Sequence, residues 1–504
     1  MFKLWSFALL VAVALAENPC SFRATDSGGV CVCNSSYCDS VPSLASLASG
    51  QYQLYETSKT NLGFTSTTGS FANSTSEADA TVTISNLTET YQTILGFGGA
   101  FTDATGINLN ILTNASREFL IQSYFGDDGI QYSLGRVPIG GTDFSTRGYT
   151  YCDVEDDSLD SFALTDEDYE DKIPYILRAI ELRGSAIKLF ASAWSAPIWM
   201  KTNEAYNGFG RVESSYYDLW AEYYLKFFDA YLENNVTFWG VTTQNEPVDG
   251  LFGTSVPNNG FTSSEMVNWI KNSFGPTIRN SSYSDLKIMV HDDQRLLLPL
   301  LKYQVISDSD VLAYADGIAV HWYTDFITSA SLLDFASSDD KDLFRLGTEA
   351  CIDPTTDLGV TIDLGSWARG ERYFKSIIED LNYDFVGWVD WNMALNTSGG
   401  PNWIQNEVDG PIIVNTTSDE FYKQPMFYAL GHFSKFVVTD SQRVAISTTD
   451  DDLDVIGFVR PDGLVAVVIL NSDDDAKSVK IDIAGATEVV QISSNSMNTL
   501  LYSP

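Results

Sequence analysis

Two stretches of this chain decide its fold: Phe238-Trp239-Gly240-Val241-Thr242-Thr243-Gln244-Asn245-Glu246-Pro247 and Leu343-Phe344-Arg345-Leu346-Gly347-Thr348-Glu349-Ala350-Cys351. Each is an apolar run typical of a buried strand, and each ends in a carboxylic acid, Glu246 or Glu349, before a loop begins. Burying an ionised carboxylate costs free energy, so packing does not explain an acid at either position. Two converging carboxylates are the groups that hydrolysis of an acetal requires.

Six other apolar runs share this character and are separated by segments with helical spacing. They cover residues 93–101, 132–137, 187–194, 286–290, 317–322 and 385–391. The clearest helical segment spans residues 215–233, and a second helix is expected to begin at Thr262, which has the capping-box spacing to Glu265. Eight strands that alternate with helices predict an α/β fold, a parallel (β/α)8 TIM barrel.

The chain beyond residue 443 has a different pattern, with short alternating strands. Residues 453–459 and 464–470 flank the turn Pro461-Asp462-Gly463, which is typical of an all-β sandwich domain. The Thr- and Ser-rich residues 51–95 also alternate and lack a partner of their own. We therefore expect both ends of the chain to form one sandwich beside the barrel.

The first residues have the features of a secretory signal peptide. A basic start and an uncharged stretch precede Ala14-Leu15-Ala16, so residues 1–16 are excluded from the fold, and no later segment is apolar enough for a membrane helix. Glycosylation in the secretory route is indicated by eight Asn-x-Ser/Thr sequons, at Asn34, Asn73, Asn86, Asn114, Asn235, Asn280, Asn396 and Asn415.

Four of the six cysteines, Cys20, Cys31, Cys33 and Cys38, lie close together near the start of the mature chain. In an oxidising compartment they predict two disulfides, with three possible pairings; a zinc site is the alternative. Cys152 and Cys351 remain as free thiols.

The net charge is −38. Nucleic acid and anionic membrane surfaces should therefore repel the protein at neutral pH. Such an excess of carboxylates fits a protein that works in acid, and equally a secreted protein with a soluble surface. No cofactor is expected: Gly96-Phe97-Gly98-Gly99 is similar to a phosphate-binding loop but lacks the third glycine at its spacing, and no Lys follows it.

The carboxyl ends of barrel strands carry the active site, so the residues that end the eight runs are candidates together. Carboxylates, amides and indoles on one rim are typical of a sugar site. These candidates are Asp103, Arg136, Asp143, Trp194, Asn245, Glu246, Asp292, Asp293, Gln294, His321, Trp322, Tyr323, Glu349, Asp390 and Trp391.

Glu246 is the better candidate for general acid, because Asn245 can bind a substrate hydroxyl and Pro247 restricts the turn. Glu349 is then the nucleophile, with Arg136 keeping it ionised and its charge raising the pKa of Glu246. Carboxyl groups about 5 to 5.5 Å apart would retain the configuration of the sugar. Activity should then follow a bell-shaped pH profile on the acid side of neutrality.

Some members of this set have a plainer explanation. A single histidine at a strand end, as at His321, is usually a hydrogen-bonded wall residue. Asp292, Asp293 and Gln294 could bind a metal through oxygen, but support of neighbouring loops is the expected role, and we expect no metal. Cys351 is expected to be a small buried side chain, since no histidine is near it in sequence.

At these residues the chain resembles the glucosylceramidases of glycoside hydrolase family 30, across nearly all of the mature chain. The motifs that carry the resemblance are Cys31-Val32-Cys33-Asn34, Tyr37-Cys38-Asp39-Ser40, Gly96-Phe97-Gly98-Gly99-Ala100, Arg136-Val137-Pro138, Asp143-Phe144-Ser145, Asp292-Asp293-Gln294-Arg295-Leu296-Leu297-Leu298-Pro299, His321-Trp322-Tyr323, Glu349-Ala350-Cys351, Asp390-Trp391-Asn392, Gly399-Gly400-Pro401-Asn402-Trp403 and Tyr422-Lys423-Gln424-Pro425-Met426-Phe427-Tyr428.

The resemblance implies a small N-terminal disulfide-bonded sheet beside the barrel and sandwich, with Cys20 paired to Cys31 and Cys33 to Cys38. The expected division is residues 17–45 plus 393–424 for this sheet, 46–91 plus 441–504 for the sandwich, and 92–392 plus 425–440 for the barrel. Glu246 is implied as acid/base and Glu349 as nucleophile, with Arg136 in support. The implied substrate-binding residues are Asp143, Trp194, Asn245, Gln294, His321, Tyr323, Trp391 and Asn406.

The resemblance further implies retaining hydrolysis of glucosylceramide, in the lysosome or outside the cell, with a saposin-type activator as a partner. The net charge argues against activator dependence, because a strongly acidic chain should bind anionic lipid poorly, and any membrane contact should be peripheral. The alternative within the family is a secreted glycanase that acts on β-1,6-glucan or xylan.

Overall fold

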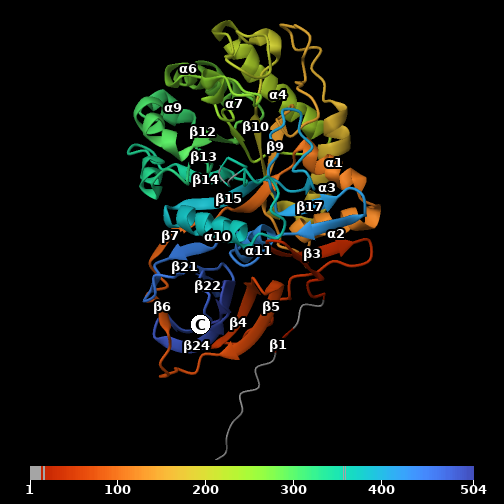
Figure 1. The fold of residues 1–504 in the computed structure, drawn as a ribbon. Coiled ribbons are helices and arrows are strands. Elements are labelled where there is room, and N and C mark those ends of the chain that lie inside the picture. Colours follow the sequence, from red (N-terminus) through yellow and green to blue (C-terminus); the bar gives the residue numbers. More distant parts are fainter. Residues whose placement is uncertain (1–12, 15–17, 356, 358) are drawn as a thin grey trace, which may run out of the picture.

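The computed structural model describes residues 13–14, 18–355, 357 and 359–504. Its centre is a closed parallel barrel, in the upper part of Figure 1, with strand order β10-β11-β12-β13-β14-β15-β8-β9. This confirms the predicted (β/α)8 barrel. The strands are β8 (Gly96–Ala100), β9 (Leu134–Ile139), β10 (Lys188–Ala193), β11 (Gly240–Thr242), β12 (Lys287–Gln294), β13 (Gly317–His321), β14 (Phe344–Glu349) and β15 (Phe385–Asn392).

One apolar layer fills the inside of the barrel. It is made by one buried side chain from each of six strands: Leu134, Phe190, Met289, Ala319, Leu346 and Val389. Gly98 on β8 makes the closure tight, because a Cβ there would lie 2.0 Å from the carbonyl oxygen of Leu134. The polar residues that follow this layer are thereby collected at the carboxyl ends of the strands.

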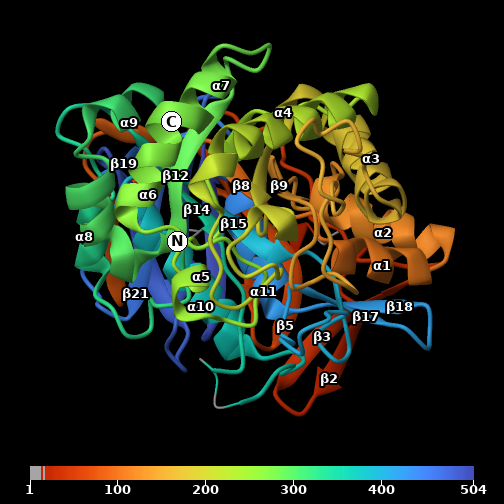
Figure 2. The same cartoon turned by 90° about the horizontal axis from the view of Figure 1, so that it is seen from above.

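Helices surround the strands, as the view from above in Figure 2 shows. They are α1 (Asp103–Ile111), α2 (Asn114–Phe125), α3 (Ile173–Arg183), α4 (Tyr217–Glu233), α5 (Asp249–Phe252), α6 (Ser263–Trp269), α7 (Gly275–Arg279), α8 (Leu298–Leu300), α9 (Ser309–Tyr314) and α10 (Trp367–Asn382). Helix α4 matches the predicted helical segment, residues 215–233, and buries an aromatic face; Thr262 and Glu265 form the predicted capping box.

Both ends of the described chain form the predicted β-sandwich. Its large sheet has the order β1-β5-β4-β25-β22-β21-β19-β7, and its small sheet the order β20-β6-β23-β24. The strands are β1 (Val13–Ala14), β4 (Gln51–Ser58), β5 (Asn61–Ser70), β6 (Ala80–Ile84), β7 (Thr90–Thr93), β19 (Gln442–Val444), β20 (Ser447–Thr448), β21 (Leu453–Val459), β22 (Val465–Asn471), β23 (Lys477–Ile483), β24 (Ala486–Ile492) and β25 (Ser496–Tyr502). Because β7 pairs with β19, the sandwich continues to Thr93, beyond the expected boundary at residue 91.

A third, five-stranded sheet joins the N-terminal cysteine region to the chain after the barrel. Its order is β16 (Leu395–Asn396), β17 (Ile412–Asn415), β18 (Glu420–Lys423), β3 (Gly28–Asn34) and β2 (Phe22–Thr25). Disulfides Cys20–Cys31 and Cys33–Cys38 are present, as the family resemblance implies, so these sulfurs are not available to zinc. Cys152 and Cys351 are free and buried.

Helix α11 (Pro425–Ser434) ties barrel and sandwich together. All ten of its residues are buried, and it packs against α10, β8, β5 and β25 (Figure 1). The sandwich and the barrel are therefore joined through a buried helix.

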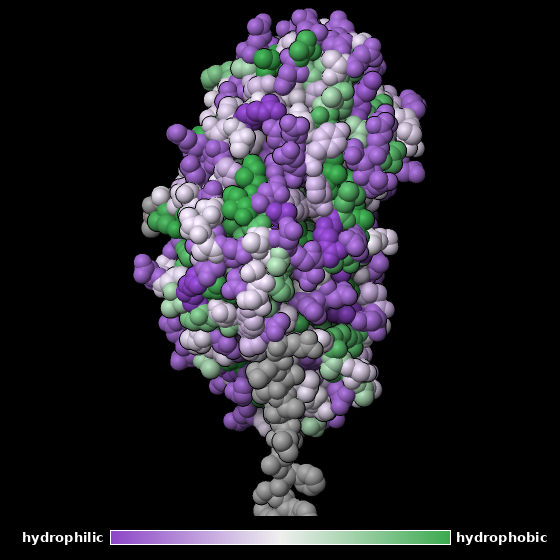
Figure 3. Space-filling view, turned by 90° about the vertical axis from the view of Figure 1, so that its right-hand side faces the viewer, coloured by the Kyte–Doolittle hydropathy of each residue, from purple (hydrophilic) through white to green (hydrophobic). Residues whose placement is uncertain are grey.

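The face in Figure 3 is largely hydrophilic, with apolar patches that are small and separate. None of the helices in the described ranges is both long and apolar enough to cross a bilayer. The predicted signal peptide, residues 1–16, lies outside the described residues apart from the backbone of Val13 and Ala14.

Candidate active site

Glu246 and Glu349 converge at the carboxyl ends of β11 and β14, which β12 and β13 separate in the barrel. Glu349 is the last residue of β14, and Glu246 follows β11 with a left-handed backbone, φ 39°. The backbone N–H of Glu246 donates to the carbonyl oxygen of Asp292 at 2.9 Å, which holds this turn. One carboxylate oxygen from each glutamate and a ring nitrogen of His321 all lie within 4.8 Å of one another.

Arg136 on β9 organises the nucleophile side of the site. It is fully buried and forms an ion pair with Glu349 and another with Asp292, the latter at 2.8 Å. Its Nη2 also donates to Asn245 Oδ1 at 2.9 Å. Tyr323 donates its hydroxyl to the other oxygen of Glu349 at 2.7 Å, so both carboxylate oxygens of Glu349 are held by donors.

Two indoles complete the surroundings of this guanidinium. Trp194 and Trp391 stack with ring centroids 4.9 Å apart, and Arg136 lies 4.8 Å from the first ring and 5.5 Å from the second. Burial alone would lower the pKa of Arg136, but the charges of Asp292 and Glu349 outweigh it and raise the pKa. The cation is therefore permanent.

His321 lies on the Glu246 side of the site. Its Nδ1 is 2.9 Å from Glu246 Oε1 and its Nε2 is 3.0 Å from Asp292 Oδ1. Burial opposes the charged ring, yet Glu349 and Asp292 together with these hydrogen bonds raise the pKa of His321 to about 10. Both ring nitrogens consequently donate. Asp292, although buried, has its pKa lowered by Arg136 and His321 and is ionised.

Glu246 has the electrostatics of a general acid. Its Oε1 accepts from Gln294 Nε2 at 2.6 Å as well as from His321, which leaves Oε2 to carry the proton of the acid form. Burial first, and then the charge of Asp249, raise the pKa of Glu246 well above its ordinary value. Glu349, named from the sequence as the cause, contributes less than either.

A pocket of about 350 Å³ opens onto both glutamates. On its opposite wall Asn406 Nδ2 donates to Asp143 Oδ2 at 2.9 Å. Burial, together with the charge of Glu349, raises the pKa of Asp143 to about 7. The predicted site residues that line the pocket are Asp143, Trp194, Glu246, Gln294, Tyr323, Glu349, Trp391 and Asn406.

Other predicted residues stand behind the pocket wall. Asn245 and His321 are buried and bonded to Arg136 and Glu246, respectively, rather than lining the pocket. Asp103 and Asp390 point elsewhere: Asp103 accepts from Ser145, and Asp390 accepts from Tyr373 at 2.8 Å.

The sequence reasoning missed residues that reach the pocket from loops. They are Phe144, Val256, Thr324, Cys351, Asp353, Thr355 and Val408. Phe144 and Cys351 stand in the family motifs, but neither is predicted as a pocket residue. The sequence reasoning also missed Asp249, whose spacing three residues after Glu246 was the available signal. Loop residues have no periodicity to mark the direction of their side chains.

Two groups of side chains are close enough to hold a metal ion within the described part of the chain: Glu246 with His321 and Glu349, and Cys33 with Cys38 and Asp39. In the second group the sulfurs form a disulfide. In the first, both nitrogens of His321 contact carboxylates and Glu349 is paired with Arg136. A protonated His321 is not a metal ligand, so the donor set does not fit a cation.

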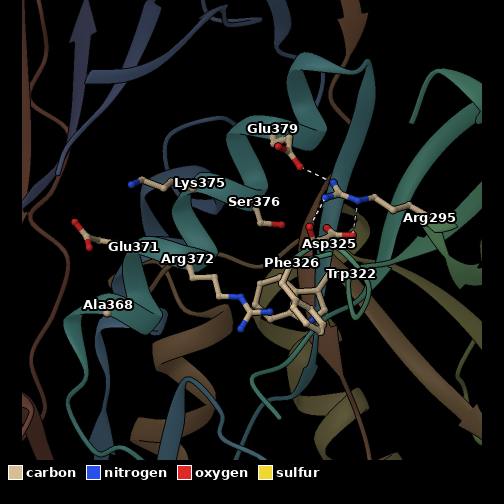
Figure 4. A pocket seen from close by; sticks show the side chains of 10 residues that line it. All are labelled: Arg295, Trp322, Asp325, Phe326, Ala368, Glu371, Arg372, Lys375, Ser376 and Glu379. Carbon is tan, nitrogen blue, oxygen red and sulfur yellow. Dashed lines mark hydrogen bonds and ion pairs between the residues drawn. The ribbon is translucent and has the colours of Figure 1, made fainter. Parts of the chain in front are cut away.

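A second cavity, of about 410 Å³, lies outside the barrel between α10 and the loop after β13. Figure 4 shows Arg295 reaching Glu379 and Asp325 across it, and Arg372 lies 4.6 Å from the ring of Trp322. Tyr323 and Thr324 of the same loop face the active-site pocket. The contacts of the outer cavity therefore support the loop that carries Tyr323.

Similarity to known proteins extends over nearly the whole chain. The glycosyl hydrolase family 30 TIM-barrel domain matches residues 94–437, and the family's β-sandwich domain matches residues 440–500. Lysosomal acid glucosylceramidase of Mus musculus is 42% identical over 489 residues, which cover 94% of this chain and 93% of the relative. An endo-1,6-beta-D-glucanase of Neurospora crassa is 26% identical over 412 residues, with 79% and 80% covered.

Among solved structures, SrfJ from Salmonella typhimurium has the same fold. The TM-score is 0.83 at 24% identity, with 90% of this chain and all of SrfJ covered. The fold, the two matching domains and the similarity along 94% of the chain agree: this chain belongs to glycoside hydrolase family 30.

Proposed function

We propose that this protein hydrolyses glucosylceramide to glucose and ceramide with retention of configuration. The observation that carries the proposal is the pair Glu246 and Glu349, whose nearest carboxylate oxygens lie within 4.8 Å. That distance suits the direct attack of a retaining enzyme and is too short for a water molecule between carboxylate and sugar. The glucosylceramide substrate is supported by the 42% identical mouse relative, which is named for it.

In the first half of the reaction Glu349 is the nucleophile. Its carboxylate, held by Arg136 and Tyr323, forms an ester bond to the anomeric carbon. The glycosidic C–O bond breaks with its electron pair going to the oxygen. This oxygen takes the proton of Glu246 and leaves as the ceramide hydroxyl. Trp194 and Trp391 line the pocket and cover the guanidinium of Arg136 during this step.

In the second half Glu246 acts as the base. It accepts a proton from water while the water oxygen bonds to the anomeric carbon, and the ester to Glu349 breaks. Glucose leaves with its original β configuration and both glutamates return to their starting forms. Asp143 and Asn406 are proposed to hold the sugar hydroxyls from the opposite wall, with Gln294 and Tyr323 beside the two glutamates. Asn245 and His321 are proposed to contribute through Arg136 and Glu246.

Replacement of Glu349 by Gln tests the proposal. Turnover of glucosylceramide should fall by roughly four orders of magnitude or more, because the amide cannot form the ester intermediate. The melting temperature should stay near that of the wild type, and Glu222→Gln, at an exposed position on α4, is the matched control. Hydrolysis at the wild-type rate by Glu349→Gln would contradict the assignment of Glu349 as the nucleophile.

A substrate comparison separates this function from the glycanase alternative. Purified protein should cleave glucosylceramide vesicles and leave β-1,6-glucan and xylan intact. The reverse preference would favour a glycanase such as the Neurospora crassa relative, which is more distant at 26% identity.

We further propose passage through the secretory pathway to the lysosome or the exterior, with peripheral rather than spanning contact with lipid. The two disulfides support an oxidising route. Stimulation by a saposin-type activator is expected to be weak at neutral pH, since the chain carries a net charge of −38.

A further inference from the structure

Asp249 lies immediately beside Glu246 and has not been given a role above. It begins the short helix α5, three residues after Glu246, and its backbone N–H donates to the carbonyl oxygen of Glu246 at 3.0 Å. This turn folds the Asp249 side chain back, so that the carboxyl groups of the two residues are hydrogen bonded to each other.

A hydrogen bond between two carboxyl groups has a chemical requirement. Ionised carboxylates only accept hydrogen bonds, so one member of the pair must be protonated. The proton lies between Glu246, whose Oε1 is already occupied by Gln294 and His321, and Asp249, which also accepts from Thr254. The pair therefore holds one proton in the resting enzyme.

The surroundings of Glu246 and Asp249 favour the state in which one of the two carboxyl groups is protonated. His321 on β13 is the facing cation, and Glu349 on β14 adds negative charge. Burial raises the pKa of Asp293 on β12 to about 7, so this third carboxyl is largely uncharged in acid. Asp293 also accepts from the backbone N–H of Val248 at 3.3 Å, inside the turn that links Glu246 to Asp249. Burial of both carboxyl groups, with the ionised Glu349 nearby, disfavours a second ionised carboxylate in the pair.

We propose that Asp249 is a positioning residue for the acid/base step, sharing one proton with Glu246 and thereby keeping Glu246 in the acid form. The inference rests on the proposed function, in which Glu246 protonates the leaving oxygen. In the first half of the reaction the shared proton leaves Glu246 for the glycosidic oxygen as the C–O bond breaks. In the second half the attacking water returns a proton to Glu246, and the pair is restored.

The pKa values of Glu246 and Asp249 agree with a shared proton. Burial, followed by the charge of Asp249, raises the pKa of Glu246 well above its ordinary value. Burial raises the pKa of Asp249 to about 6. Without the Asp249 charge, Glu246 should lose its proton at a lower pH.

The test is the pH profile of kcat/KM for Asp249→Asn. The basic limb should move to lower pH by about one unit, so that the loss of activity is small at pH 4.5 and grows to about tenfold at pH 7. Asp249→Glu, which keeps the charge, should restore most of the wild-type basic limb. Asp475→Asn removes an exposed charge in the sandwich and serves as the control for net charge.

Three outcomes would overturn the inference. They are an unmoved basic limb in Asp249→Asn, an equal loss of activity at every pH, and failure of both Asp249→Asn and Asp249→Ala to fold. Glu246→Gln is measured alongside. Wild-type hydrolysis by Glu246→Gln would mean that the proposed function itself assigns the acid wrongly. An inactive Glu246→Gln with an unmoved profile in Asp249→Asn would remove only the role of Asp249.

Discussion

A single arginine determines the electrostatics of the nucleophile. Arg136 is 0% exposed and bonds to Glu349, Asp292 and Asn245 at once. Three partners in different directions require a planar group with several donors, which lysine does not have. The stacked indoles also favour a delocalised cation over an ammonium group.

Arg136→Lys should therefore preserve the charge and still impair the enzyme. We expect kcat to fall by about 10²-fold, since Glu349 loses its fixed orientation. The free energy of unfolding should fall by about 3 kcal/mol because a buried carboxylate is left without its partner. Steady-state kinetics and urea unfolding measure both effects. Arg147→Lys, at an exposed pair with Glu167, is the control, and equal behaviour of the two variants would contradict the role of Arg136.

At the scale of elements, the loop after β13 connects the active site to the outer cavity. Arg295 is nearly buried and donates to the carbonyl oxygens of Asp325 and Thr328, each at 2.7 Å, while pairing with Glu379 on α10. These contacts pin the segment that presents Tyr323 and Thr324 to the pocket. The barrel supplies the strand end, and α10 keeps the loop in position.

Arg295→Lys should loosen this loop without removing a group from the pocket. We expect KM to rise by about threefold or more with a smaller change in kcat. The reason is that part of the free energy of substrate binding must then be used to order the loop. Limited proteolysis should cut the segment after Tyr323 faster than in the wild type. Arg178→Lys at the partly exposed pair with Glu118 is the control. A variant with unchanged KM and unchanged cleavage would show that other contacts hold the loop.

At the scale of the whole molecule, acidity and burial act together. The net charge of −38 means that the ionised carboxylates repel one another at neutral pH. Burial also raises the pKa of several carboxyl groups across the fold and is the largest cause of each shift. The pKa is raised to about 7 for Asp143, Asp171, Asp293 and Asp325. A folded-state pKa above the unfolded value gives stability that is complete below the unfolded pKa and is lost as pH rises through the folded pKa. These carboxyls thus favour the folded state in acid and lose that contribution between about pH 4 and pH 7.

Two buried histidines oppose this trend. Burial lowers the pKa of His432 in α11 to about 3 and that of His291 to about 4. A lowered folded-state pKa gives stability that is present above the unfolded value and is lost as pH falls through the folded pKa. The carboxyls are the more numerous group, so maximum stability should lie in mild acid.

The melting temperature should accordingly be higher at pH 5.5 than at pH 8, by roughly 5 °C. Asp171→Asn should reduce this difference by raising the melting temperature at pH 8, since Asn110 can still donate to the new side chain. Differential scanning calorimetry at both pH values measures it, with Asp475→Asn as the control for net charge. A higher melting temperature at pH 8 would contradict the account.

Much of the secondary structure could be predicted from the local pattern of apolar and polar residues. All eight barrel strands overlap the predicted apolar runs, and α4, which bears Trp220 and Phe227, overlaps the predicted helical segment at residues 215–233. In a parallel barrel every strand delivers its last residue to the same rim, so the sequence by itself determined that Glu246 and Glu349 would meet. The disulfide pairing, in contrast, needed the family resemblance, because spacing leaves three possibilities open.

Only the tertiary structure decided which rim residues reach the pocket. The pairing of β12 with β13 shifts register between His291 and Asp293, and His291, Asp292 and Glu246 have positive φ. These local departures send Asp292 to Arg136 and fold Asp249 back on Glu246, while Asp103 and Asp390 turn away. The direction of a side chain at a strand end follows from backbone angles set by closure of the barrel, and periodicity in the sequence carries no record of those angles.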